Sequence, residues 1–205
     1  MKALPPSMGK GRLEAFSDGV IAIIITIMVL ELKVPEGETL ATLAPMLPVL
    51  LVYALSFIYV GIYWNNHHHM LHTVERVNGP ILWANLHLLF WLSLFPFATA
   101  WMGENHFAAV PAALYGGVML MAAISFTVLS RCIIAAQGPD SLLHHAVGAD
   151  RQGKISIVCY VIAIPTALLG WRWVAIALYL LVAGIWFIPD RRIERALSSS
   201  LEAGQ

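Results

Sequence analysis

The sequence predicts an all-α integral membrane protein with six transmembrane helices per subunit, and its composition and apolar patterning carry this prediction. Of the 205 residues, 59% are hydrophobic and only 12% are charged, and the mean hydropathy is +0.75. A soluble domain usually carries about 25% charged residues. The apolar residues form several long runs instead of one, so they are not a signal peptide on a soluble body.

A membrane span needs about 20 predominantly apolar residues, with a range of about 17 to 25. The apolar runs predict one transmembrane domain over residues 1–190, with spans at 16–34, 43–64, 81–102, 108–134, 155–169 and 171–188. Only Gly170 and its neighbours separate the last two spans, which predicts a tight antiparallel hairpin. Residues 191–205 are predicted to form a cytoplasmic tail.

Lysine and arginine residues are distributed unevenly between the two sides of this arrangement. Two of them, Lys33 and Arg172, belong to the side away from the termini. The other ten are Lys2, Lys10, Arg12, Arg76, Arg131, Arg151, Lys154, Arg191, Arg192 and Arg195. Because cytoplasmic loops carry the excess of positive residues, we predict that both termini are cytoplasmic. The lack of a targeting signal favours a bacterial plasma membrane, and the balanced total charge gives no indication of nucleic-acid binding.

The first predicted span places an acidic residue at the mouth of a membrane helix. Ser17 and Asp18 precede a run of isoleucines. Successive helical residues turn by about 100°, so Ile23, Ile27 and Leu30 share an apolar stripe while Asp18 points about 140° away from Ile23. An acid in this place caps the helix or needs a polar partner. We predict that Ser17 and Asp18 face polar groups on other helices. The stripe then faces either lipid or an axis shared by several copies.

Polar residues at the ends of the next two spans lie at the same predicted depth as Asp18. The second span ends in the sequence Trp64-Asn65-Asn66-His67-His68, and Asn85 lies in the first turns of the third. The sequence therefore predicts a polar network at the cytoplasmic ends of the first three spans.

These segments resemble the transmembrane protein 175 family of potassium channels. Arg12, then Phe16-Ser17-Asp18-Gly19 and an aliphatic run, resemble the family's opening signature, and Trp64 to His68 resemble its Trp-x-x-His-His motif. The segment Leu94-Phe95-Pro96-Phe97-Ala98-Thr99 resembles the family's third helix, with Ala98 in place of the usual second proline. The motifs cover about the first half of the chain.

The resemblance implies a homotetrameric channel in the bilayer that passes potassium ions, needs no cofactor and is not an enzyme. It implies a pore lined by the first helix, with a constriction at Ile23, Ile27 and Leu30 and a selectivity role for Thr26. It also implies that a network holds the pore helix. The residues of that network would be Arg12, Phe16, Ser17, Asp18, Trp64, Asn85 and either His67 or His68.

Three alternatives remain open from the sequence. Protons could pass through the same pore, because histidine titrates near neutrality. A metal-ion transporter could use the cluster from His67 to His72, in which His68 and His72 share a helix face. A membrane enzyme could use Asp18, His67 and His87 as acid and base, although no nucleophile pattern accompanies them. The two cysteines, Cys132 and Cys159, fall within apolar runs and are predicted to be packing residues.

Overall fold

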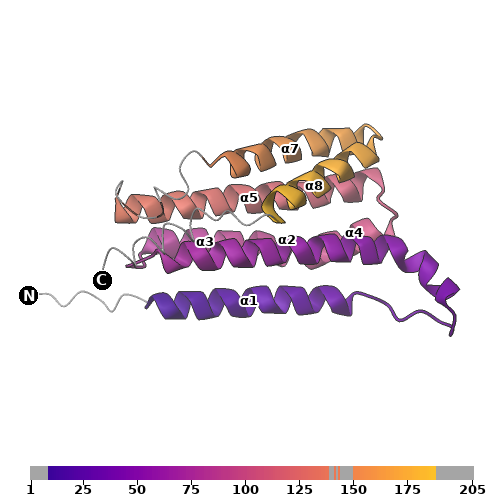
Figure 1. The fold of residues 1–205 in the computed structure, drawn as a ribbon, viewed down its shortest axis with the longest axis horizontal. Coiled ribbons are helices and arrows are strands. Elements are labelled where there is room, and N and C mark those ends of the chain that lie inside the picture. Colours follow the sequence, from indigo (N-terminus) through magenta and orange to yellow (C-terminus); the bar gives the residue numbers. More distant parts are fainter. Residues whose placement is uncertain (1–8, 139–140, 142, 144–149, 188–205) are drawn as a thin grey trace, which may run out of the picture.

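The computed structural model of the chain describes residues 9–138, 141, 143 and 150–187, and these residues form helices joined by turns and loops (Figure 1). The helices are α1 (Lys10–Leu30), η1 (Leu40–Met46), α2 (Leu47–His72), α3 (Gly79–Ser93), α4 (Phe95–Glu104), α5 (Ala109–Gln137), α7 (Arg151–Leu168) and α8 (Arg172–Phe187). The predicted tail at 191–205 lies outside the described residues.

Proline and glycine residues set several of the helix boundaries. The predicted third span consists of two helices, since α3 ends at Ser93 and α4 begins at Phe95. Pro96 explains the interruption, because it has no N–H for the carbonyl of Leu92 and its ring clashes with that carbonyl. Further along the chain, Gly170 separates α7 from α8 with a φ of 89°. Glycine adopts this left-handed conformation readily.

Four helical segments are long and apolar enough to cross a membrane. They are Lys10–Leu30, Leu40–His72, Gly79–Glu104 and Ala109–Gln137. α8 is apolar but shorter, with 16 residues, and α7 begins with the polar residues Arg151, Gln152 and Lys154. The prediction of an all-α integral membrane protein is therefore confirmed.

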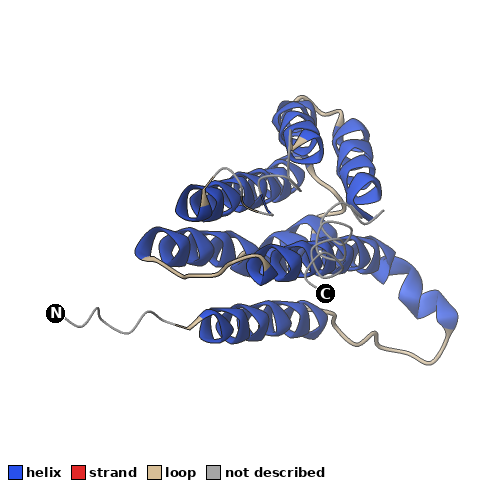
Figure 2. Cartoon of the chain, turned by 60° about the vertical axis from the view of Figure 1, so that its left-hand side comes forward, coloured by secondary structure: helices blue, strands red, loops and turns tan. Residues whose placement is uncertain are grey.

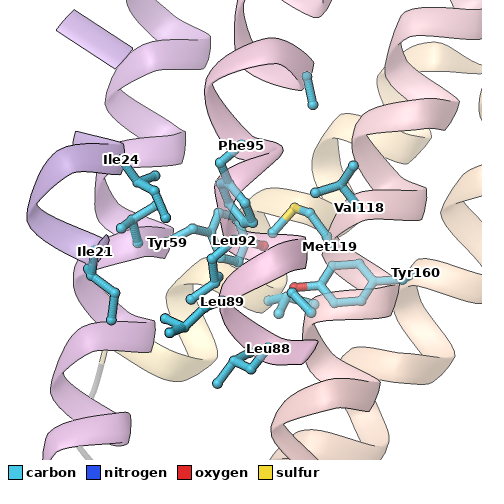
Figure 3. Close-up of a cluster of buried hydrophobic side chains, with 14 of the residues drawn as sticks. Ile21, Ile24, Tyr59, Leu88, Leu89, Leu92, Phe95, Val118, Met119 and Tyr160 are labelled. Carbon is cyan, nitrogen blue, oxygen red and sulfur yellow. The ribbon is translucent and has the colours of Figure 1, made fainter. Parts of the chain in front are cut away.

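α1 lies along one edge of the molecule, and the α7–α8 hairpin lies on the opposite side (Figures 1 and 2). α1 packs against α2, α3 and α4, while α5 packs against α3 and α7. The buried cluster in Figure 3 includes Ile21 and Ile24 of α1 together with Leu88 and Leu92 of α3. α1 thus contributes one face to the core and leaves its other face unpaired within the subunit.

Hydroxyl groups join the helices in the middle of the core. Ser56 Oγ lies 3.0 Å from Tyr115 Oη and accepts a hydrogen bond from Thr99 Oγ1 at 2.7 Å. Tyr179 Oη donates to the carbonyl of Ala112 at 3.0 Å. These bonds tie α2, α4, α5 and α8 together without leaving the buried hydroxyls unsatisfied, which would cost free energy in an apolar interior.

A salt bridge joins the loop after α1 to the end of α4. Lys33 Nζ lies 2.6 Å from Glu104 Oε1, and both side chains are exposed. The hydrogen bond to Glu104 raises the pKa of Lys33. Because exposed pairs contribute little to stability, this contact positions the loop more than it stabilises the fold.

Two adjacent glycines on α5 allow a test of how α5 packs against α8. A Cβ on Gly116 would lie 2.2 Å from Tyr179 Oη, whereas a Cβ on Gly117 would meet nothing within 4 Å. Gly116→Ala is therefore expected to destabilise the fold by about 1–3 kcal/mol through overpacking. Gly117→Ala is expected to leave stability unchanged or to raise it slightly, because alanine favours the helix. Thermal unfolding of the two purified variants measures the difference, and equal midpoints would contradict this account of the α5–α8 contact.

Candidate functional site

α1 has one face that packs into the subunit and another that does not. The residues that pack inward are Leu13, Ser17, Ile21, Ile24 and Met28. Ile23, Ile27 and Leu30 point outward, with 57%, 40% and 80% of their surface exposed. We call these three residues and Thr26 the α1 stripe. Bulky apolar groups that are exposed along a membrane helix face either lipid or another protein surface.

Thr26 is the polar member of the α1 stripe. Its side chain is exposed, and Oγ1 donates a hydrogen bond to the carbonyl of Ile23 at 2.9 Å. This bond satisfies the hydroxyl hydrogen within the helix and leaves oxygen lone pairs facing outward. The α1 stripe therefore combines bulky apolar side chains with one hydroxyl oxygen that can accept a hydrogen bond or coordinate a cation.

The inward face of α1 is held by a buried chain of hydrogen bonds. Asn85 Nδ2 donates to Ser17 Oγ at 2.9 Å, and Asn85 Oδ1 accepts from His67 Nε2 at 2.7 Å. Ser17 Oγ in turn donates to the carbonyl of Leu13 at 2.8 Å. Ser17, His67 and Asn85 are each at most 1% exposed. The three residues, which we call the polar anchor, join α1, α2 and α3 at one depth.

Asp18 and Trp64 form a second contact beside the polar anchor. Trp64 Nε1 donates to Asp18 Oδ1 at 3.0 Å, and the ring of His68 stacks on the indole with centroids 6.0 Å apart. His67 and His68 therefore have different environments. His67 is buried and bonds to Asn85, whereas His68 is half-buried and stacks on Trp64. Two adjacent residues of α1 therefore contact different helices, since Ser17 bonds to Asn85 of α3 and Asp18 bonds to Trp64 of α2.

Two residues implied by the resemblance do not join these contacts. Phe16 is 52% exposed. Arg12 is exposed, and its guanidinium group has no hydrogen bond or ion pair with the described part of the chain. Arg12 precedes Ile23 by 11 residues, which is about three turns, so both lie on the outward side of α1.

A contact that sequence reasoning missed holds the start of α1. Lys10 Nζ donates to the backbone carbonyl of His72 at 2.7 Å and lies 3.9 Å from Glu14 Oε1. The spacing of Lys10 and Glu14 is a sequence signal for a pair on one helix face. The carbonyl of His72 gives no such signal, because its exposure depends on where α2 ends.

The remaining histidines of the alternatives lie apart from the polar anchor. His87 Nδ1 bonds to Ser125 Oγ at 3.0 Å, and His87 Nε2 accepts from Trp91 at 3.0 Å, so His87 faces α5. The rings of His68 and His72 are 4.5 Å apart. Over the described ranges, no group of three or more His, Cys, Asp or Glu side chains is placed to hold a metal ion. Of the groups that the enzyme alternative needs, His87 therefore bonds to α5 and not to the polar anchor.

Comparisons with known proteins identify relatives over most of the chain. A potassium channel of Chryseobacterium sp. (strain P1-3) is 58% identical over 193 residues, which cover 94% of this chain and all of that protein. The human endosomal/lysosomal proton channel TMEM175 is 35% identical over 96 residues, which cover 40% of this chain and 19% of that protein. The crystal structure of a lysosomal potassium-selective channel TMEM175 homolog from Chamaesiphon minutus superposes with a TM-score of 0.77 at 29% identity, covering 88% of this chain and 97% of that one.

A family profile matches the part of the chain that contains α1 and the polar anchor. The profile, described as endosomal/lysosomal potassium channel TMEM175, matches residues 12–96. This range begins at Arg12 and ends at Pro96, so it includes the α1 stripe and each residue of the Ser17–Asn85–His67 chain. Together with the relative that matches along almost its whole length, this shows that the chain belongs to the TMEM175 family.

Proposed function

We propose that the chain is a subunit of a homotetrameric potassium channel whose pore is lined by the α1 stripe. The observation that carries the proposal is the outward face of α1, which is apolar, exposed and opposite the packed face. Membership of the TMEM175 family supports it, as does a relative named as a potassium channel that matches almost the whole chain. Four copies with the α1 stripe around a shared axis would cover the surface that a single subunit leaves exposed.

The apolar side chains of the α1 stripe explain how the proposed pore would close. A ring of Ile23 side chains forms a hydrophobic constriction that closes by dewetting. A potassium ion that leaves its water shell cannot cross an apolar ring without a large free-energy cost. Opening must therefore widen the ring so that water enters with the ion.

The polar anchor gives α1 a fixed point about which such widening can occur. Ser17 lies six residues before Ile23, and a helix rises about 1.5 Å per residue, so about 9 Å of axis separates the anchor from the ring. A tilt or rotation of α1 at Ser17 would move Ile23 while the bond between Ser17 and Asn85 persists. We propose that gating moves α1 in this way.

Thr26 is proposed to favour potassium over sodium. Four hydroxyl oxygens could supply part of the coordination that a dehydrated ion loses, and potassium sheds its water more easily than sodium. Thr26→Val keeps the shape of the side chain but removes the hydroxyl, so the permeability ratio of potassium to sodium is expected to fall toward one. Thr26→Ser keeps the hydroxyl and is expected to retain most of the preference. Reversal potentials in planar bilayers measure both ratios, and an unchanged ratio for Thr26→Val would remove Thr26 from the mechanism.

Proton conduction through the same pore is the second candidate. Animal relatives are named as endosomal/lysosomal proton channels, although their matches cover only a part of this chain. Purified protein in liposomes, tested with gradients of potassium, sodium, caesium and protons, distinguishes the two functions. Potassium flux well above sodium flux supports the first function. Proton flux without potassium flux would replace it with the second.

We further propose that the channel lies in a bacterial plasma membrane with both termini in the cytoplasm. This orientation puts the polar anchor and the histidines of α2 at the cytoplasmic end, and the Lys33–Glu104 salt bridge at the outer end. Labelling of single cysteines placed at Gly9 and Glu36 in intact cells tests it. Reaction of a cysteine at position 9 with a membrane-impermeant reagent would contradict the proposed orientation and place the N-terminus outside.

A further inference from the structure

A cavity lies inside each subunit on the side of α2 away from α1. Its volume is about 40 Å³. Since one water needs about 10–15 Å³ of such space, the cavity holds a group of roughly three heavy atoms. The aromatic side chains that line it come from α2, α5, α7 and α8, and they are Tyr59, Tyr63, Phe126, Tyr160 and Trp186.

The rings that line this cavity are held in place by contacts of their own. Tyr63 meets Phe126 edge-on, with ring centroids 6.1 Å apart. Trp186 Nε1 donates to Ser156 Oγ at 2.8 Å, and Tyr59 Oη donates to the carbonyl of Tyr179. The aromatic walls are therefore preorganised, and aromatic faces attract cations.

The cavity lining includes a carboxylate. Among the described residues that line it, Asp150 is the one with a formal charge. Asp150 Oδ1 accepts from the backbone N–H of Gly153 at 3.1 Å, which leaves Oδ2 without that bond. A Cβ at position 153 would lie 2.6 Å from both carboxylate oxygens, so the carboxylate rests where glycine leaves room for it. A carboxylate in a cavity that is also lined by aromatic rings favours a positively charged guest.

An open groove continues from the cavity along the surface of α2 and α8. Its volume is about 260 Å³, and it shares Ile62, Asn66 and Trp186 with the cavity. Beyond the shared residues its lining is mainly apolar and consists of Phe57, Ile58, Gly61, Asn65 and Phe187. The cavity that contains Asp150 and the groove beside it together match a molecule with a small cationic head and a hydrocarbon chain.

We propose that each subunit binds the ammonium group of an amphiphile in the aromatic cavity, with its hydrocarbon chain in the groove. The ammonium hydrogens would bond to the Asp150 carboxylate while the rings of Tyr63, Phe126 and Trp186 surround the charge. A free long-chain amine and the ethanolamine headgroup of a membrane lipid share this chemistry. The site is separate from the α1 stripe, because the two lie on opposite sides of α2.

Calorimetric titration of the full chain in phosphatidylglycerol nanodiscs with decylammonium tests the proposal, after subtraction of empty nanodiscs. Asp150→Asn is expected to raise Kd about tenfold or more, because a charge-assisted bond is lost. Asparagine still caps the first turn of α7, so this variant keeps its fold. Trp186→Leu is expected to weaken binding as well. Glu75→Gln removes an exposed acid outside the cavity and is expected to bind as the wild type does.

Decanol, which has the same chain length as decylammonium but no charge, serves as the control ligand. It is expected to bind the wild type and Asp150→Asn equally, because it has no charge for the carboxylate. A competitive rise of the decylammonium Kd in nanodiscs that contain phosphatidylethanolamine identifies the lipid headgroup as the source. An unchanged Kd identifies a free amine. Equal decylammonium affinity in the wild type, Asp150→Asn and Trp186→Leu would overturn the proposal, whether or not the protein conducts ions.

Discussion

Replacing Ile23 with asparagine is expected to raise the resting potassium flux of reconstituted protein at least about tenfold. The amide carries water into the constriction, so the ring no longer closes by dewetting. A tenfold rise corresponds to a barrier lower by about 1.4 kcal/mol, which is a small part of the cost of dehydrating an ion. Potassium efflux from loaded liposomes, followed with a potassium-sensitive electrode, measures this effect.

Val29 provides a matched control on the same helix. It is an exposed apolar residue, with 46% of its surface exposed, but it lies about 120° around the helix from Ile23. Val29→Asn is therefore expected to leave the flux at the wild-type level. If Val29→Asn leaks as much as Ile23→Asn, the asparagine acts on the fold and not on a constriction.

Replacing Asn85 with leucine is expected to lower stability by about 2 kcal/mol and to raise the resting flux. Leucine has a similar size but leaves Ser17 and His67 without their shared partner inside the protein. Each buried polar group that loses its partner costs about 1–3 kcal/mol, and hydrogen bonds between membrane helices are at the lower end of this range. The flux is expected to rise because α1 loses its hydrogen bond to α3 and is held there by apolar packing alone.

A second asparagine serves as a control for the loss of an amide side chain. Asn105 is exposed after α4, and its side chain bonds only locally, to the carbonyl of Trp101. Asn105→Ala is expected to change the unfolding midpoint little. Both midpoints are measured by thermal unfolding in the same detergent. A wild-type midpoint for Asn85→Leu would show that the polar anchor does not stabilise the packing of α1.

Helical geometry explains how much of α1 could be predicted from the sequence. A turn of about 100° per residue separates Ser17 from Ile23 and Leu30 regardless of tertiary structure. The structure buries Ser17 and exposes Ile23 and Leu30. The sequence left open whether this outward face meets lipid or other subunits, because both surroundings accept apolar side chains.

Tertiary contacts determine which of the two adjacent histidines joins the polar anchor. His67 and His68 are adjacent residues that differ by 100° around α2, so the choice between them depends on the rotation of α2 toward α3. The structure places His67 against Asn85 and His68 against Trp64. Arg12 and Phe16 were grouped with the polar anchor because of the resemblance, yet both face outward in the single subunit. Such a position is consistent with contacts that form only when several subunits assemble.

Helix ends were predicted less well than helical secondary structure for a similar reason. Hydropathy ends a predicted span where the polar residues begin, but a polar helix can continue into water. α2 therefore runs through the histidines to His72, and α5 runs to Gln137. The third span was predicted as one continuous helix, whereas the structure divides it at Leu94, just before Pro96.

The central claim is that four α1 helices surround the ion path with the α1 stripe at the centre. A cryo-electron microscopy reconstruction of the wild-type protein in lipid nanodiscs tests it most directly. The account predicts a fourfold particle in which Ile23, Ile27 and Leu30 of each copy face the axis and Asp18 faces Trp64. A monomeric particle, or a tetramer with the α1 stripe against acyl chains, would contradict it.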